Sequence, residues 1–114
     1  MTDKVVVLVT AASLKEARKI ARGLVQARLA ACVNIAAPVE SIYRWQGKIE
    51  TGLERLLVIK TSREIFPEAQ AQIRKFHSFT NPEIICLPII DGSHEYLDWL
   101  AQSVKTAAVA ESEP

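Results

Sequence analysis

The spacing of apolar and polar residues along the chain predicts four strands and three helices. The run from Lys4 to Thr10 is β-branched and almost uninterrupted, which is typical of a central strand covered on both faces. Across residues 13–29, apolar residues recur every three or four positions between basic residues, which predicts an amphipathic helix. Ser13 and Glu16 have the spacing of a capping box in its first turn.

An unusually long hairpin follows in the pattern. Strand character runs through residues 31–36 and resumes at residues 39–45, so Pro38 indicates a bulge or an edge position. Gln46 and Gly47 suit a tight turn, after which the chain returns through Lys48 to a strand at residues 56–61. Gly52 is predicted to form a bulge on the returning strand.

The second half of the chain repeats the order of helix and strand. Thr61 and Glu64 have capping-box spacing, and Pro67 favours a regular helix that begins there. Residues 83–90 predict the last strand, with Pro88 indicating an edge or a bulge. Apolar residues at helical spacing then predict a short closing helix; they are Tyr96, Leu97, Leu100 and Val104.

The resulting order, βαββαβ plus a terminal helix, predicts the α+β ferredoxin-like class. Right-handed crossovers then give an antiparallel four-stranded sheet with both main helices on one face. Residues 1–104 form a single domain in this interpretation. Residues 105–114 are Ala-rich and acidic without a pattern, and we expect them to form a flexible tail.

The second face of this sheet is also predicted to be buried. Residues 56–59 and residues 84–87 are apolar at both odd and even positions, whereas a strand with one wet face alternates. A chain of 114 residues has only its closing helix left to cover that face. We therefore expect self-association, the alternative being that the closing helix covers more of the sheet.

Composition and charge argue against nucleic acid or a membrane as the partner and against secretion. The chain has 14 basic and 13 acidic residues, so its net charge of +1 offers no overall field for nucleic acid or an anionic membrane. The apolar run from Val5 to Val9 is too short for a secretory core of about 7–15 residues. Cys32 and Cys86 lie in apolar runs and indicate buried thiols rather than a disulfide. These features favour a cytoplasmic protein.

Several functions found on this fold lack their required residues. The two central strands carry no aromatic residue for base stacking by an RNA-recognition domain. Residues 10–13 contain neither the thiol pair of a heavy-metal chaperone nor the glycines and arginine of an acyl-phosphate hydrolase. Two His and two Cys residues at this spacing give no nucleophile–base arrangement. The sequence therefore predicts no enzyme, and an enzyme would need a composite site between subunits.

The candidate functional residues are polar or aromatic residues at unusual positions. Aromatic residues of this kind are often anchors of subunit interfaces, and a histidine after a helix is often stabilised by the helix dipole. The candidates are Tyr43 and Trp45 on the hairpin, Lys60 at the end of a strand, His77 and Glu83 before the last strand, and Trp99 on the closing helix.

The sequence resembles the CutA family from about Val5 to Ser103. The resemblance rests on the combination of several motifs rather than on any one of them. They are LAACVN at residues 29–34, SIYRWQGK at residues 41–48, Ile59-Lys60-Thr61, Pro82-Glu83-Ile84, Leu87-Pro88-Ile89, and the ending Asp91-Gly92-Ser93 with Tyr96-Leu97 and Trp99-Leu100.

The resemblance implies a homotrimer of ferredoxin-like subunits, similar in architecture to trimeric nitrogen-regulatory signal proteins, and a non-enzymatic role in tolerance to copper and other divalent cations. The loop at residues 77–83 departs from the family pattern because it lacks a proline and a tyrosine after His77. Copper ligands proposed for some members correspond to Val9, Phe76 and His77, of which only His77 can bind a metal.

Two hypotheses follow for the site. In the first, no cofactor is required and the trimer responds to or binds copper or another divalent cation through His77 and Glu83. Three symmetry-related His77 side chains, or His77 with Glu83 of a neighbour, would then supply the ligands. In the second, a sensor or signalling adaptor binds a small anionic ligand, without metal, in an intersubunit cleft lined by Tyr43, Trp45, Lys60 and Glu83. Tyr43, Trp45 and Trp99 are the predicted interface residues in either case.

Overall fold

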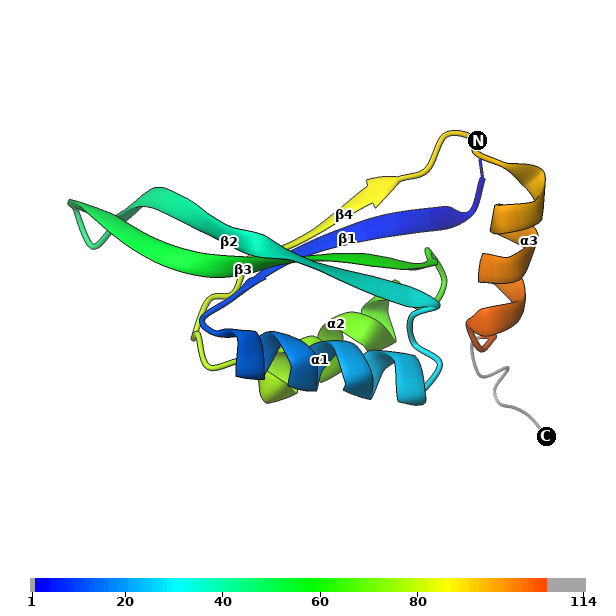
Figure 1. Cartoon of the computed structure of the whole chain (residues 1–114), viewed down its shortest axis with the longest axis horizontal. Coiled ribbons are helices and arrows are strands. Elements are labelled where there is room, and N and C mark those ends of the chain that lie inside the picture. The colour runs from blue at the N-terminus through cyan, green and yellow to red at the C-terminus, as the bar shows by residue number, and fades with distance from the viewer. Residues whose placement is uncertain (1, 107–114) are drawn as a thin grey trace.

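The computed structural model describes residues 2–106 and shows the predicted α+β arrangement, with a sheet packed on two helices (Figure 1). The strands are antiparallel in the order β2-β3-β1-β4, which is the ferredoxin-like order. The elements are β1 (Lys4–Ala11), α1 (Leu14–Gln26), β2 (Cys32–Trp45), β3 (Lys48–Ser62), α2 (Phe66–Phe76), β4 (Ile84–Pro88) and α3 (His94–Ser103).

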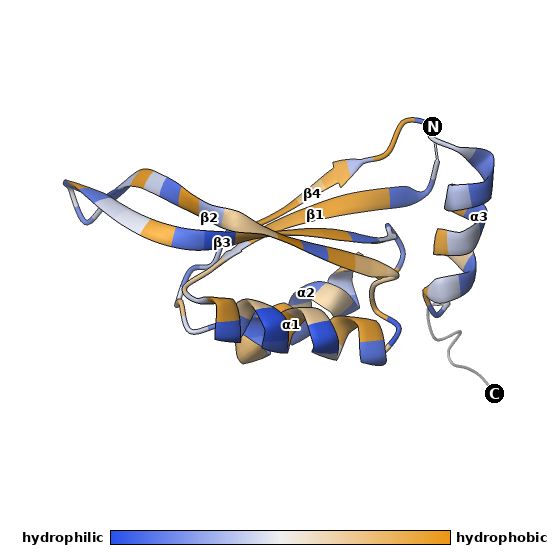
Figure 2. Cartoon of the chain, in the orientation of Figure 1, coloured by the Kyte–Doolittle hydropathy of each residue, from blue (hydrophilic) through white to orange (hydrophobic). Residues whose placement is uncertain are grey.

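The core lies between the sheet and the helices α1 and α2. On β1, Val5, Val7 and Val9 are at most 4% exposed, and on β3 Leu57 and Ile59 are fully buried. The residues between them point to the opposite face and are only half-buried. The prediction that β1 is covered on both faces is therefore wrong for one chain, because both main helices lie on the same side. Figure 2 shows β1 and β4 largely apolar, the projecting parts of β2 and β3 mixed, and much of the outer surface of α1 polar.

The hairpin forms as predicted except at Gly52. The register between β2 and β3 shifts between Ile35 and Pro38, which confirms the bulge there. The turn has positive φ at Gln46 (50°) and Gly47 (80°), as a type I′ turn requires. Gly52, however, pairs with Ser41 in unbroken register, so the bulge predicted there is absent. The register of β2 against β3 therefore shifts once, between Ile35 and Pro38.

Only the first of the two predicted capping boxes has a capping side chain. The Ser13 hydroxyl accepts a hydrogen bond from the Glu16 amide at 3.1 Å and caps α1. The Thr61 hydroxyl instead donates to the Leu29 carbonyl at 2.7 Å, inside the core, so it is not available to cap α2. The N-cap of α2 is Ile65 without any side-chain bond, and Pro67 lies in the first helical turn.

The chain end differs from the sequence expectation in two places. β4 ends at Pro88 rather than at Ile90, which fits an edge strand that pairs only with β1. Lys105, predicted to begin the flexible tail, is held by Glu68 at 2.6 Å and by the Arg28 carbonyl at 2.9 Å. The rest of the predicted tail from residue 107 lies outside the described residues.

The closing helix α3 stands at the end of the sheet away from the hairpin tip (Figure 1). Leu100 of α3 is fully buried and holds the helix against the core. The Arg28 guanidinium also donates a hydrogen bond to the Gln102 carbonyl at 2.5 Å. On β4, Ile85 and Leu87 remain 44% and 43% exposed. The helix therefore leaves much of the second sheet face open.

Cys86 lies half-buried on β4 against the core, as a free thiol. Burial raises the pKa of this thiol, and Arg63 opposes that shift more weakly. The thiolate is the reactive form, so its fraction at a given pH is smaller than for a free cysteine. We expect iodoacetamide to alkylate Cys86 more slowly than free cysteine at pH 8, measured by peptide mass spectrometry. A rate at or above that of free cysteine would contradict this.

Candidate functional site

The loop after α2 is tied to the sheet through His77, whose side chain is fully buried. The Phe79 amide donates to His77 Nδ1 at 3.1 Å, so that nitrogen is an acceptor. Nε2 then carries the proton and donates to the Thr10 carbonyl at 2.7 Å. Both ring nitrogens are therefore engaged within the chain.

Glu16 connects the same loop to α1. Its carboxylate accepts from the Ser78 amide at 2.8 Å and from the Ser78 hydroxyl at 2.8 Å. It also lies 3.4 Å from His77 Nδ1. The sequence assigned Glu16 to a capping box, but its side chain extends to the loop instead of returning to Ser13.

Removing this carboxylate is expected to loosen the loop. Glu16→Ala leaves the Ser13 cap in place but deletes the charged acceptor for Ser78, which costs about 1–2 kcal/mol of unfolding free energy. Hydrogen exchange at the Ser78 amide should accelerate. Lys15→Ala, an exposed neighbour on the same helix, is the control and should leave that rate unchanged. Equal exchange rates in both variants would contradict the assignment.

A cleft of about 810 Å³ separates this loop from the long hairpin. Aromatic side chains from both sides line it, namely Tyr43 and Trp45 on β2 and Phe79 on the loop. Glu54 on β3 and Glu83 before β4 are its acidic residues. The volume lies within the range of small-molecule sites, about 300–1,000 Å³.

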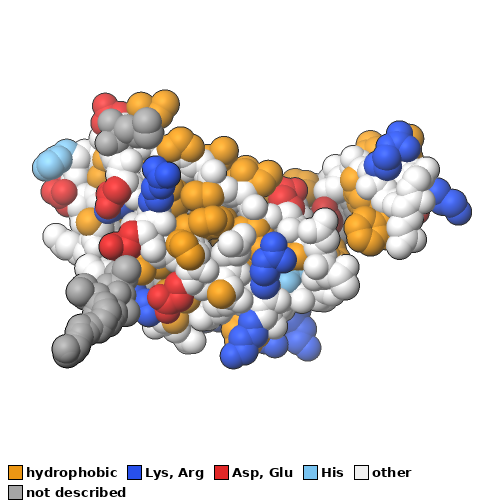
Figure 3. Space-filling model, turned by 180° about the vertical axis from the view of Figure 1, so that it is seen from behind, with side chains coloured by type: hydrophobic (Ala, Val, Ile, Leu, Met, Phe, Trp, Pro, Cys, Tyr) orange, Lys and Arg blue, Asp and Glu red, His pale blue; other side chains and the backbone are white. Residues whose placement is uncertain are grey.

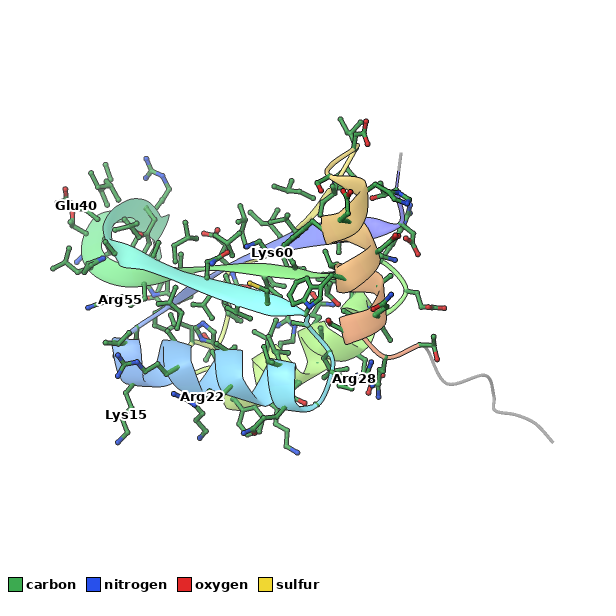
Figure 4. The ribbon with its side chains drawn as sticks, turned by 45° about the vertical axis from the view of Figure 1, so that its right-hand side comes forward. Lys15, Arg22, Arg28, Glu40, Arg55 and Lys60 are labelled. Atoms are coloured by element: carbon green, nitrogen blue, oxygen red, sulfur yellow. The ribbon has the colours of Figure 1, made fainter. Side chains whose placement is uncertain are left out.

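The structure brings together three of the four residues predicted for a ligand cleft. Tyr43, Trp45 and Glu83 line the cleft, but Lys60 does not. Lys60 lies on the open face of the sheet, on the side of β3 away from α1 (Figure 4), and its ammonium donates to the Asn34 side chain. Trp99 lies on α3, 43% exposed and 5.4 Å from the Tyr96 ring.

Sequence reasoning missed Glu54 and Phe79. The signal for Glu54 was available in the hairpin register, because Glu54 pairs with Val39 and so shares a face with Tyr43 and Trp45. No sequence pattern marks Phe79 as a cleft residue, because its position depends on the hydrogen bonds that His77 and Ser78 make with distant residues. Local sequence does not encode those bonds.

A metal site within one chain does not fit these residues. Between residues 2 and 106, no group of three or more His, Cys, Asp or Glu side chains is placed to hold an ion. His77 would have to give up a bond to Thr10 or Phe79 in order to bind one. Glu83 is exposed and belongs to no such group within the described residues. A metal held by His77 or Glu83 would need ligands from another chain.

The second distinctive feature is an apolar surface. The open sheet face carries half-buried or exposed aliphatic residues from three strands, and Figure 3 shows apolar side chains gathered between α3 and the hairpin. The residues on this face, which we call the open-face patch, are Val6, Leu8, Leu56, Val58, Ile85 and Leu87.

The projecting hairpin adds a further apolar stripe. Ile42, Ile49 and Leu53 share one face of the hairpin by register and are 68–72% exposed. Large aliphatic side chains at such exposure mark a protein contact surface.

Fold and site together define a small α+β ferredoxin-like protein whose distinctive features are exposed apolar surfaces and a cleft. No helix between residues 2 and 106 has the length and apolar character needed to cross a bilayer. The chain belongs to the CutA1 divalent ion tolerance protein family, whose family model matches residues 5–103.

Individual relatives agree with this membership. The chain is 49% identical to the divalent-cation tolerance protein CutA of Thermus thermophilus, over 86% of this chain and 95% of that protein. It is 41% identical to a chloroplastic CutA protein of Arabidopsis thaliana, over 89% of this chain but only 56% of that longer protein. The solved structure of the T. thermophilus divalent cation tolerance protein superposes with a TM-score of 0.88, covering 90% of this chain and 99% of that one.

Proposed function

We propose that this chain acts in tolerance to copper and other divalent cations as a non-enzymatic homotrimer in the cytoplasm. The observation that carries the assembly is the apolar open-face patch, which a single chain leaves uncovered. Membership in the divalent ion tolerance family supports the link to metal ions. The protein responds to metal through its assembled surface and catalyses no reaction.

Direct metal binding in this proposal requires ligands from more than one subunit. One chain supplies the exposed Glu83 carboxylate, and the trimer repeats that carboxylate three times. Repetition by symmetry raises the number of donors without any new residue type. The alternative of a sensor or signalling adaptor keeps its own site, an intersubunit cleft in which Lys60 would meet a small anionic ligand.

Calorimetric titration with copper and zinc tests the metal role. We expect saturable heat from the unaltered protein and at least a tenfold weaker affinity in Glu83→Gln, because a neutral amide is a much poorer ligand than a carboxylate. Glu64→Gln, at an exposed glutamate in the turn before α2, is the matched control and should bind as the unaltered protein does. Absence of saturable heat in the assembled protein would reject direct binding.

A further inference from the structure

The two helices that cover the sheet are strongly basic, unlike the rest of the chain. Together α1 and α2 contain six basic and two acidic side chains, a net charge of +4, whereas the whole chain carries +1. All six basic side chains are exposed. We call them the cationic patch; they are Lys15, Arg18, Lys19 and Arg22 on α1, and Arg74 and Lys75 on α2.

Neither acidic side chain of the two helices neutralises this patch. The Glu16 carboxylate accepts hydrogen bonds from the amide and the hydroxyl of Ser78, and Glu68 pairs with Lys105 at 2.6 Å. Among residues 2–106, no member of the cationic patch has an acidic partner within 4.0 Å. The patch is therefore an uncompensated surface charge and not a network of ion pairs.

The cations follow one face of α1 and meet those of α2 at Phe76. The four cations of α1 are spaced by three or four positions, so they lie on one face over about 10 Å of helix. Figure 4 shows Lys15 and Arg22 pointing away from the sheet. The ammonium groups of Lys19 and Lys75 lie 5.2 and 5.8 Å from the centroid of the Phe76 ring, which is 36% exposed. The cationic patch thus borders one exposed apolar ring.

Assembly through the open-face patch leaves the cationic patch uncovered. The helices α1 and α2 cover the face of the sheet opposite to that patch (Figure 1). In a closed ring of subunits, the copies of the cationic patch would face outward around the axis. The exposure of these side chains in one chain is therefore also expected in the assembled protein.

The spread of the charges favours an extended partner over a single ion. Cations that lie along about 10 Å of helix do not converge on one phosphate or carboxylate. Base stacking by nucleic acid needs a free aromatic face, whereas the Phe76 ring has two ammonium groups over it. A flat anionic bilayer attracts only the cations near its surface, and so meets only some of the outward-facing copies. A flexible chain with spaced carboxylates fits each copy, because guanidinium groups hold carboxylates in bidentate pairs.

We propose that the cationic patch binds an acidic segment of another protein, with Asp or Glu side chains spaced along it and an apolar residue against Phe76. Arg18 and Arg22 hold carboxylates of the segment, and Lys19 and Lys75 attract further ones beside the ring. The proposal goes beyond the metal response and uses the side of the molecule opposite to the open-face patch, so either one can fail alone.

Fluorescence anisotropy of a labelled acidic peptide tests this binding. The probe is a short fluorescein-labelled peptide of glutamates around one leucine, and its control has glutamine in place of every glutamate. We would titrate both with the unaltered protein at neutral pH and low salt, and then raise the sodium chloride concentration. We expect saturable binding of the acidic peptide only, with an affinity that falls as salt screens the charges. An acidic peptide with glycine in place of the leucine should bind more weakly.

Charge variants assign the binding to the cationic patch. Lys19→Gln and Arg22→Gln should each raise the half-saturation concentration roughly two- to fivefold, the effect of one exposed charge. Arg63→Gln is the matched control, because it removes an exposed cation in the turn before α2, at the end of that helix away from Phe76. It should leave the affinity unchanged. The molar mass of the three variants should equal that of the unaltered protein, since none of them changes the open-face patch.

Three results would overturn the proposal. Equal binding of the acidic and the neutral peptide would show that charge plays no part. An equal loss of affinity in Arg63→Gln would show attraction to the whole molecule and not to the cationic patch. Tighter binding of an oligothymidylate strand, or of phosphatidylserine vesicles, than of the acidic peptide would assign the patch to nucleic acid or to a membrane surface.

Discussion

Ile85→Asp is expected to convert the assembled protein to monomers at micromolar concentration. Ile85 is 44% exposed in one chain and belongs to the open-face patch, on the edge strand β4 beside Leu8 of β1. Assembly through this patch would bury the new carboxylate without a partner, which costs several kcal/mol in each subunit. The single chain should still fold, because the position is at an exposed edge strand. Sedimentation velocity measures the change.

Val25→Asp is the matched control for this prediction. Val25 has nearly the same exposure, 42%, but lies on α1, on the opposite side of the molecule from the open-face patch. It introduces the same charge and should leave the assembly intact. Dissociation by both variants, or by neither, would show that the open-face patch is not the contact surface.

Leu24→Ala is expected to lower the free energy of unfolding by about 2–5 kcal/mol, the cost of a cavity in a closed core. Leu24 is fully buried between α1 and the sheet. Chemical denaturation at fixed protein concentration measures the change, because assembly makes stability depend on concentration.

The next residue on the helix provides the control. Val25→Ala removes exposed methyl groups and places a better helix former on α1, so its effect should stay within about 0.5 kcal/mol. Comparable losses of unfolding free energy in the two variants would mean that Leu24 is not buried between α1 and the sheet.

Most of the fold follows from local pattern. Ser13 caps α1 because its short hydroxyl side chain reaches a free backbone amide in the first turn of the helix. The Gln46-Gly47 turn forms because glycine adopts positive φ without steric cost. Thr61 matches a capping pattern equally well, yet its hydroxyl bonds to Leu29 in the core. A motif of two residues does not reveal which distant acceptor competes for its side chain.

The site was less predictable because it depends on contacts between distant segments. Tyr43, Trp45, Lys60 and Glu83 were predicted to line a cleft between subunits. Within one chain, Tyr43, Trp45 and Glu83 line one cleft and Lys60 lies outside it. Lys60 shares its strand with Glu54 but lies six residues further along, beside Asn34. The role of His77 likewise depends on Thr10, which is 67 residues away in the chain.

The molar mass in solution tests the central claim most directly. Light scattering on the unaltered protein, over a range of concentrations and without added metal, should give about three times the chain mass of 12.6 kDa. A mass of 12.6 kDa across that range would contradict the account, because the apolar open face and the hairpin stripe would then have no partner copy to cover them.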